Sequence, residues 1–130
     1  MTNRNRKTGN SFEQEFCDIL AANGFWAHNM TQNSTGQPAD VIAAYHNVPI
    51  LVDCKVCSHD KFDINRIEPN QEAAMMTWLN CGNKYCYFAM KLSDNNIYMV
   101  HFNQLTKSIT DFTFYPDINL WMEMVKCKYP

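Results

Sequence analysis

The chain has 130 residues, a net charge of −2 at pH 7 and a hydrophobic content of 46%. These values favour one folded domain with its own core and argue against a disordered chain. No apolar run approaches the roughly 18 residues of a transmembrane helix, and the polar start has no apolar segment of signal-peptide type. We therefore expect a cytoplasmic protein without a membrane partner, in which the six cysteine residues are reduced thiols.

Residues 1–8 are polar and basic, and we expect a flexible arm there. Arg4, Arg6 and Lys7 lie in this arm. Two interpretations remain open for it: an arm that contacts DNA phosphates, or a disordered tail.

A first helix is predicted from Asn10 or Ser11, either of which can cap it, to Asn23. Apolar residues recur on one side at helical spacing: Phe12, Phe16, Ile19 and Leu20. Glu13 and Glu15 flank this stripe at similar angles, so the helical period does not decide which one turns toward a sheet. For both, a solvated acid near a helix N-terminus is the commoner situation.

Three strands are predicted next, over Phe25–Met30, Asp40–Tyr45 and Ile50–Val56. A polar loop at 31–37 separates the first two, and a turn at 46–49 separates the others. Side chains alternate along a strand, so Asp53 and Lys55 share one face. The opposite face takes Val52, Cys54 and Val56.

Asp40, Asp53 and Lys55 are costly on the surface of a small sheet if they are merely buried. Around a metal ion and a phosphate they have a use, which suggests a metal-dependent nuclease. The alternative for Asp53 and Lys55 is an ion pair on a solvated face. Cys54 and Cys57 form a C-x-x-C pattern, but they point to opposite faces of a strand, which disfavours a zinc site, and no helix starts there, which disfavours a thioredoxin-like redox pair.

A polar connection over 58–68 is the natural place for a substrate-facing loop, and Lys61 and Arg66 lie in it beside the proposed site. The remaining predicted elements are a helix from Pro69 or Asn70 to Gly82, a hairpin of Lys84–Lys91 and Ile97–Phe102, and a helix from the cap Asp117 to about Cys127. The αβββαβ order predicts an α/β fold with a central mixed sheet flanked by helices. We expect a single domain, 1–130, in which residues 103–130 form a C-terminal extension with a helix.

The pattern Gly9-x-x-x-Glu13, then Asp40, then Asp53-Cys54-Lys55, resembles the PD-(D/E)XK nuclease superfamily. More narrowly, the chain is similar to small Holliday-junction resolvases of the archaeal and RecU types. The opening helix RKTGNSFEQEFCDILAANGF and the segment NQEAAMMTWLNCG carry this likeness, which covers roughly Lys7 to Phe102. There are two departures: Pro38-Ala39-Asp40 replaces Pro-Asp, and Asp53 stands where Glu is commoner.

The resemblance implies a restriction-endonuclease-like core and Mg²⁺-dependent cleavage of branched DNA, with Mn²⁺ as a substitute ion. By position, it implies that the metal is held by Asp40, Asp53, the backbone carbonyl of Cys54 and Glu13. It also implies that Lys55 orients the attacking water and that Gln71 and Ser34 or Thr35 contact phosphate or water. The basic residues Arg4, Arg6, Lys7, Lys61 and Arg66 would then bind DNA.

A junction resolvase should be a homodimer, since a four-way junction has two-fold symmetry. Candidate dimer surfaces are the aromatic strands between Lys84 and Phe102 and the helix of Trp121, although core packing is the commoner fate of such side chains. The resemblance also suggests a phage-encoded protein.

Two other functions stay open: a nuclease of the same type that acts on flaps, ends or duplex DNA, and a non-catalytic binding module on the same scaffold. The net charge of −2 lacks the basic excess of most DNA-binding domains, which bears on junction recognition more than on nuclease chemistry.

Overall fold

The protein folds around a five-stranded mixed sheet with the strand order β1-β2-β3-β4-β5. The structure is a computed structural model that describes residues 3–30 and 39–128, with side chains from Ser11 onward. The strands are β1 (Trp26–Asn29), β2 (Val41–Tyr45), β3 (Val48–Cys57), β4 (Tyr85–Leu92) and β5 (Ile97–His101). The helices are α1 (Asn3–Ala22), α2 (Pro69–Asn80) and α3 (Ile118–Cys127). Within the described residues, no helix is long and apolar enough to span a membrane.

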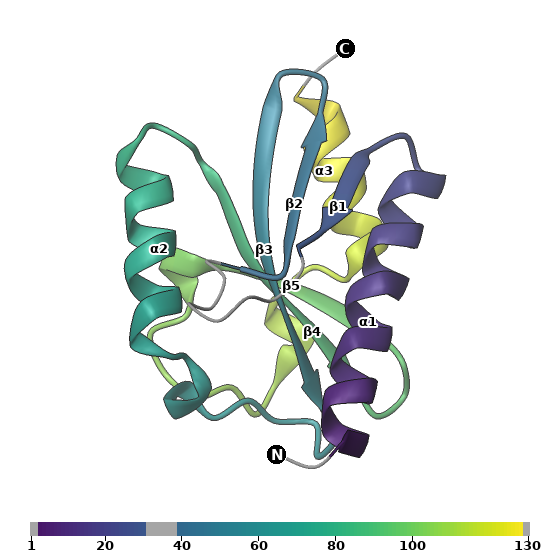
Figure 1. Ribbon diagram of the computed structural model, residues 1–130, viewed down its shortest axis with the longest axis vertical. Coiled ribbons are helices and arrows are strands. Elements are labelled where there is room, and N and C mark those ends of the chain that lie inside the picture. Colours follow the sequence, from purple (N-terminus) through teal and green to yellow (C-terminus); the bar gives the residue numbers. More distant parts are fainter. Residues whose placement is uncertain (1–2, 31–38, 129–130) are drawn as a thin grey trace.

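Strands β1, β2 and β3 form an antiparallel meander, β4 runs parallel to β3, and β5 returns antiparallel to β4. A parallel pair needs a crossover connection, and α2 supplies it between β3 and β4. Helices α1 and α3 lie on one side of the sheet and α2 lies on the other (Figure 1). The predicted α/β fold with a mixed sheet flanked by helices is therefore confirmed.

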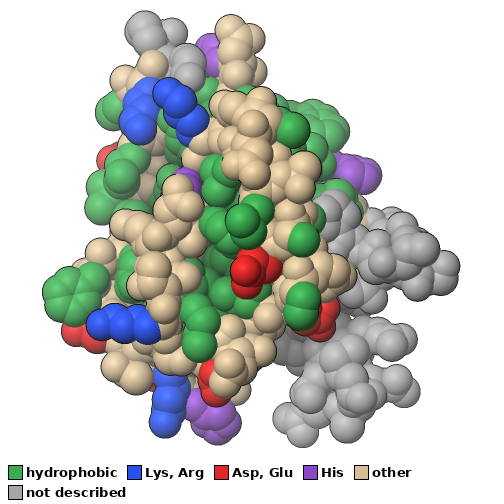
Figure 2. Space-filling view, turned by 90° about the vertical axis from the view of Figure 1, so that its left-hand side faces the viewer, with side chains coloured by type: hydrophobic (Ala, Val, Ile, Leu, Met, Phe, Trp, Pro, Cys, Tyr) green, Lys and Arg blue, Asp and Glu red, His purple; other side chains and the backbone are tan. Residues whose placement is uncertain are grey.

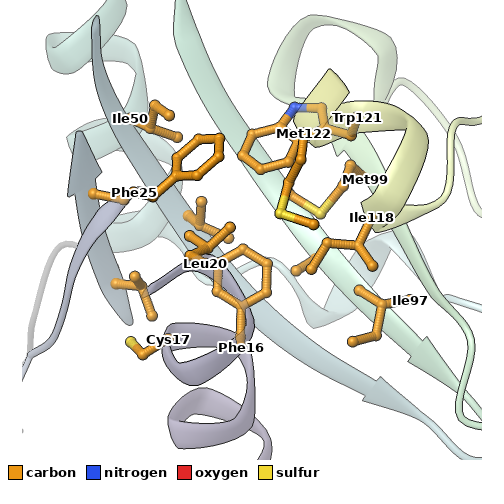
Figure 3. Packing of buried hydrophobic residues seen from close by; sticks show 14 of the residues in the cluster. Phe16, Cys17, Leu20, Phe25, Ile50, Ile97, Met99, Ile118, Trp121 and Met122 are labelled. Carbon is orange, nitrogen blue, oxygen red and sulfur yellow. The ribbon is translucent and has the colours of Figure 1, made fainter. Parts of the chain in front are cut away.

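The larger hydrophobic cluster lies between the sheet and the helices α1 and α3. Figure 3 shows Phe16 and Leu20 of α1 meeting Trp121 and Met122 of α3 across side chains from the strands. Trp121 is fully buried, and its ring lies 6.1 Å from that of Phe25. Since Trp121 is a core residue, it is not part of a dimer surface. The same holds for the buried positions of β4 and β5, which include Phe88 and Met99.

The second cluster lies under α2 and contains Met75, the one residue of this helix that is fully buried. The C-terminal part of the chain adds to this side of the sheet. Phe62 forms a β-bridge with Ile109, and the Ser108 hydroxyl accepts a hydrogen bond from the Ile64 N–H at 2.9 Å. The segment after β5 is thus packed on the sheet next to the loop that follows β3.

Helix α1 begins at Asn3, several residues before the predicted start at Asn10 or Ser11. The backbone of residues 3–8 is therefore helical, and the role of this segment as a basic arm stays a prediction. Once a helix has formed, each residue added to it gains one more hydrogen bond. Arginine and lysine are also good helix formers, so the helix extends through this basic segment. At its other end the chain turns at Gly24, whose φ of +88° suits glycine.

The last predicted cap is confirmed. The Asp117 carboxylate accepts a hydrogen bond from the Leu120 N–H at 2.8 Å, and α3 then runs to Cys127. Such a cap satisfies one of the N–H groups that the first turn of a helix leaves unpaired.

Candidate active site

Strand β3 places Asp53 and Lys55 together on the face of the sheet that α2 covers. The Lys55 Nζ lies 3.1 Å from the Asp53 Oδ2, and the two side chains are 13% and 0% exposed. Leu51 and Cys57, the neighbours on this face, belong to the hydrophobic cluster under α2. The charged pair therefore interrupts an apolar surface, and the alternative of an ion pair on a solvated face is wrong.

Gln71, in the first turn of α2, connects both members of this pair. Its Nε2 donates to the Asp53 Oδ1 at 3.1 Å, and its Oε1 accepts from the Lys55 Nζ at 3.4 Å. The same Oε1 accepts from the backbone N–H of Glu68, the residue that caps α2, at 3.4 Å. Gln71 was expected to contact phosphate or water, but in this structure both ends of its amide group contact protein atoms.

Asp40 lies where β3 begins to extend beyond β2. The last pair between these strands is Val41 with Val52, and the Asp40 N–H donates to the Val52 carbonyl at 3.1 Å. The Asp40 carboxylate continues this hydrogen bonding, because its Oδ2 accepts from the Cys54 N–H at 2.7 Å. The N–H and C=O of one strand residue point to the same side, so the Cys54 carbonyl faces the side of Asp40. Asp40 and the Cys54 carbonyl are thus placed as a pair of oxygen donors.

Glu13 comes to Asp40 from the other side of the sheet, on α1. Partial burial, the charge of Asp40 and a hydrogen bond between the two carboxyl groups together raise the pKa of Glu13 to about 7. Glu15 instead forms an ion pair with Lys91 of β4 at 2.6 Å. The structure resolves the choice that the helical period left open: Glu13 turns toward Asp40, and Glu15 turns toward β4.

Desolvation also acts on Asp53, which lies between the sheet and α2. Burial, the charge of Asp40 and a hydrogen bond with Asp40 raise the pKa of Asp53, the Lys55 ammonium opposes them, and the resulting pKa is about 8. The charge of Asp40 thus disfavours the ionised forms of both Glu13 and Asp53. If all three carboxyl groups ionised, their negative charge would exceed what Lys55 alone offsets, and a divalent cation would supply the missing positive charge.

The oxygen donors here fit such a cation. The buried Asp53 Oδ2 has no hydrogen-bond partner within the described part of the chain, although the Lys55 ammonium contributes its charge from 3.1 Å. No three His, Cys, Asp or Glu side chains among the described residues are grouped so as to hold a metal by themselves. Mg²⁺ needs only one or two carboxylates, because water and substrate phosphate complete its shell. Asp40 and Asp53 meet that requirement.

Of the basic residues predicted to bind DNA, the structure describes the side chains of Lys61 and Arg66. Lys61 is exposed in the loop after β3. Arg66 donates to the Val56 carbonyl at 3.1 Å and lies 5.4 Å from the centre of the Phe62 ring, so it also holds this loop to the sheet. On the side of the molecule where α2 lies, Figure 2 shows Lys and Arg side chains near the top and toward the lower edge, and an acidic group among hydrophobic ones near the centre.

The remaining residues predicted to contact DNA lie in two other parts of the chain. Ser34 and Thr35 lie outside the described residues, as do the side chains of Arg4, Arg6 and Lys7. The backbone of the last three belongs to α1.

Two residues near the site were missed by the motif. Glu68 contributes the N–H that meets Gln71; the two form a capping box, but its sequence signal is incomplete because Glu stands where Ser or Thr is usual. Lys91 carries no such signal, because its partner Glu15 is 76 residues away in the sequence. Only the parallel register of β3 and β4 brings Lys91 to this end of the sheet.

Comparison with known proteins identifies the family. A family model described as archaeal Holliday junction resolvase (hjc) matches residues 4–120. The match therefore continues past Phe102, where the likeness read from the sequence motifs ended, to residue 120. A search of curated proteins finds no match.

Among solved structures, the chain is similar to Archaeoglobus fulgidus Hjc, described as a Holliday junction resolvase from an archaeal hyperthermophile. The TM-score is 0.70 at 14% identity, over 88% of this chain and 98% of that chain, which shows a shared fold. The matched family consists of endonucleases that bind and resolve Holliday junctions and depend on a divalent metal ion. Since the family model spans most of the sequence, the chain belongs to the archaeal Holliday junction resolvase family.

Proposed function

We propose that Asp40, Asp53 and Lys55 carry the hydrolysis of phosphodiester bonds at four-way DNA junctions. The observation that carries this assignment is the pair of Asp53 and Lys55, held 3.1 Å apart in apolar surroundings next to Asp40. A buried pair of this kind is weak as a stabilising element, because desolvation offsets the attraction between its charges. A raised pKa of about 8 for Asp53 is typical of a functional site.

Mg²⁺ is the ion that we propose, with Mn²⁺ as a substitute. Asp40, Asp53 and the Cys54 carbonyl would hold it, and Glu13 would bind a water or a second ion beside them. All of these are the oxygen ligands that hard cations prefer. When bound, the ion lowers the pKa of a water molecule and withdraws charge from the phosphoryl oxygens.

Lys55 acts through its ammonium group. Asp53 and Gln71 hold this group on the protein side, while the 13% exposure of the side chain leaves it accessible to substrate. In this proposal the ammonium orients the attacking water and offsets the negative charge that develops on the phosphate.

Junction binding uses basic and hydroxyl side chains outside the metal site. We assign phosphate contacts to Arg4, Arg6, Lys7, Ser34 or Thr35, Lys61 and Arg66. Because the net charge of the chain is −2, these contacts are few, and junction binding should weaken only moderately as salt is added.

The chain works as a two-fold symmetric homodimer, since one junction needs two coordinated cuts. Trp121 and the inward side chains of β4 and β5 are occupied in the core. Within the described residues, the large hydrophobic side chains that remain exposed for a contact are Trp26, Met76, Phe114, Leu120 and Met124.

We place the protein in the cytoplasm. All six cysteine residues are free thiols, which suits a reducing compartment.

The test is cleavage of a synthetic four-way junction with Mg²⁺, mapped at nucleotide resolution beside flap, splayed-arm and linear duplex DNA. We expect paired, symmetric cuts near the branch point and much slower cleavage of the linear duplex. Equal cleavage of all substrates would contradict junction specificity. If no DNA is cut and calorimetry detects no binding of Mg²⁺ or Mn²⁺, the chain is a binding module on this scaffold.

A further inference from the structure

Gln71 stands between the start of α2 and the charged pair on β3. We propose that Gln71 is a positioning residue, which uses the backbone N–H of Glu68 as a fixed reference to orient Asp53 and Lys55. This inference rests on the proposed function of that pair. It replaces the expectation that Gln71 contacts phosphate or water directly.

The direction of the Gln71 amide follows from its neighbours. A side-chain amide has one acceptor end and one donor end, whereas a backbone N–H can only donate. The Glu68 N–H lies 3.4 Å from the Oε1, so the acceptor end must face the start of α2. The Lys55 ammonium, also only a donor, lies 3.4 Å from the same oxygen. Because the Glu68 N–H and the Lys55 ammonium both lie next to the Oε1, the Nε2 at the other end of the amide points at Asp53.

This orientation distinguishes the two oxygens of Asp53. The Nε2 of Gln71 donates to the Oδ1 at 3.1 Å. The other oxygen, Oδ2, has no hydrogen-bond partner within the described residues and faces Lys55 at 3.1 Å. Gln71 therefore fixes the rotation of the Asp53 carboxylate and leaves the Oδ2 for a cation. A flipped amide would lose the Glu68 contact and place its oxygen against the Asp53 carboxylate.

The reference point itself is held firmly. Glu68 has φ −80° and ψ 145°, and Pro69 follows it at the first position of α2. The chain enters Glu68 from a 3₁₀ turn whose Arg66 donates to the Val56 carbonyl on β3 at 3.1 Å. The contacts to the Oε1 are long, so their contribution to stability is small. Their effect is to select one orientation of the amide.

Two substitutions at Glu68 isolate its N–H group. Proline has no N–H, and the φ of Glu68 is within the range that proline adopts. Ile67 has φ −79° and ψ 118°, which a following proline allows. Glu68→Pro therefore removes the donor to Gln71, while Glu68→Ala removes the same side chain and keeps the donor. The difference between these variants measures the N–H alone.

A second pair of variants tests Gln71 itself. Gln71→Met keeps the length of the side chain and removes both hydrogen-bonding ends. Gln104→Met is its matched control, because Gln104 accepts from the His101 N–H at 3.2 Å in a capping box that has no part in the site. Both variants lose the same kind of cap contact, and only Gln71→Met changes the surroundings of Asp53 and Lys55.

The experiment measures single-turnover cleavage, junction affinity and, in metal-free protein, the NMR signals of the Lys55 side chain. Loss of a residue that orients a metal ligand typically lowers activity or metal affinity about 10- to 100-fold. We expect Gln71→Met to lose cleavage on this scale, and Glu68→Pro to be roughly tenfold slower than Glu68→Ala, with junction affinity unchanged in all. The Lys55 signals should move in Gln71→Met and Glu68→Pro and stay in place in Glu68→Ala and Gln104→Met.

Equal rates and equal Lys55 signals for Glu68→Pro and Glu68→Ala would overturn the inference, as would full cleavage by Gln71→Met. If Gln71→Met does not fold, the comparison at Glu68 still decides. A wild-type protein that leaves junctions uncut would instead contradict the proposed function. In that case the Lys55 signals still report whether Gln71 orients the pair.

Discussion

The two faces of β3 differ in almost every respect. On one face Ile50 and Val52 are fully buried in the cluster that α1 and α3 cover, with only hydrophobic neighbours on the strand. On the other face Asp53 and Lys55 lie among apolar residues under α2, a helix that buries just Met75 completely. The first face holds the fold together. On the second face, keeping charged groups away from water lowers the stability of the fold. This face carries the side chains that we assign to catalysis.

This difference predicts that stability and cleavage can be changed independently. Substitutions under α1 and α3 should lower stability and spare cleavage in the folded protein. Substitutions under α2 at the charged pair should do the reverse.

The largest effect is expected from the charged residues themselves. Asp40→Ala, Asp53→Ala and Lys55→Ala should each lower single-turnover cleavage of a four-way junction by about 10³-fold or more, because each removes a group that stabilises the transition state. Junction binding, measured by gel shift without divalent ions, should stay largely intact. Asp18→Ala is the matched control, since Asp18 is an exposed acid of α1 that contacts Gln14. Near-normal cleavage by Asp53→Ala would refute the assignment.

On the opposite face, Trp121→Ala should lower the free energy of unfolding by about 3–5 kcal/mol, the usual cost of removing a large buried aromatic side chain. Trp121 is fully buried between α1, α3 and the sheet. Urea unfolding measures the loss, and the cleavage rate below the unfolding transition should stay within a few-fold of wild type. A rate that falls as far as that of Asp53→Ala would show that the two faces are not independent.

A smaller effect should appear in the dependence of stability on pH. The folded protein raises the pKa of Glu13 from 4.5 to about 7 and that of Asp53 from 3.8 to about 8. Between the ordinary and the raised values the folded state binds more protons than the unfolded state. The metal-free protein should therefore lose stability as the pH rises through this window.

Metal affinity should change in the opposite sense, since the ligands must be deprotonated to bind an ion. Melting temperatures in a chelator from pH 5 to 9, and Mg²⁺ titrations over the same range, measure the two trends. In Glu13→Gln the loss of stability between pH 5 and 7 in the chelator should be smaller than in the wild type. Stability that rises with pH in the chelator would contradict the raised pKa values.

The smallest effect is expected at the ion pair between Glu15 and Lys91. Both side chains are partly exposed, at 40% and 22%, so solvent screens their attraction. Glu15→Gln should lower stability by about 1 kcal/mol or less. Cleavage by this variant tests whether the pair also holds Glu13 toward Asp40: a fall of several-fold with normal stability would indicate that it does, and an unchanged rate would limit it to packing α1.

The sequence was sufficient to predict the sheet, the order of its elements and the shared face of Asp53 and Lys55, because strand alternation is local. It could not decide between Glu13 and Glu15, whose partners lie on different strands. It also placed the start of α1 too late, since the polar residues 3–8 carry no hydrophobic period to mark a helix. The contacts of Gln71 with Asp53 and Lys55 depend on where α2 meets β3, which no local pattern contains. The individual roles of the site residues stay predictions.

The crossover between β3 and β4 has a consequence for when the protein can act. Asp53 and Gln71 are 18 residues apart, and they meet only after α2 has passed over the sheet and β4 has paired with β3. Pairing of distant parallel strands is intrinsically slow, because the connecting segment loses conformational entropy before the new contacts stabilise the pair. A chain that is still folding therefore has the residues of the motif but not their arrangement around Asp53. We expect junction cleavage to begin only once α2 has packed and β4 has paired with β3.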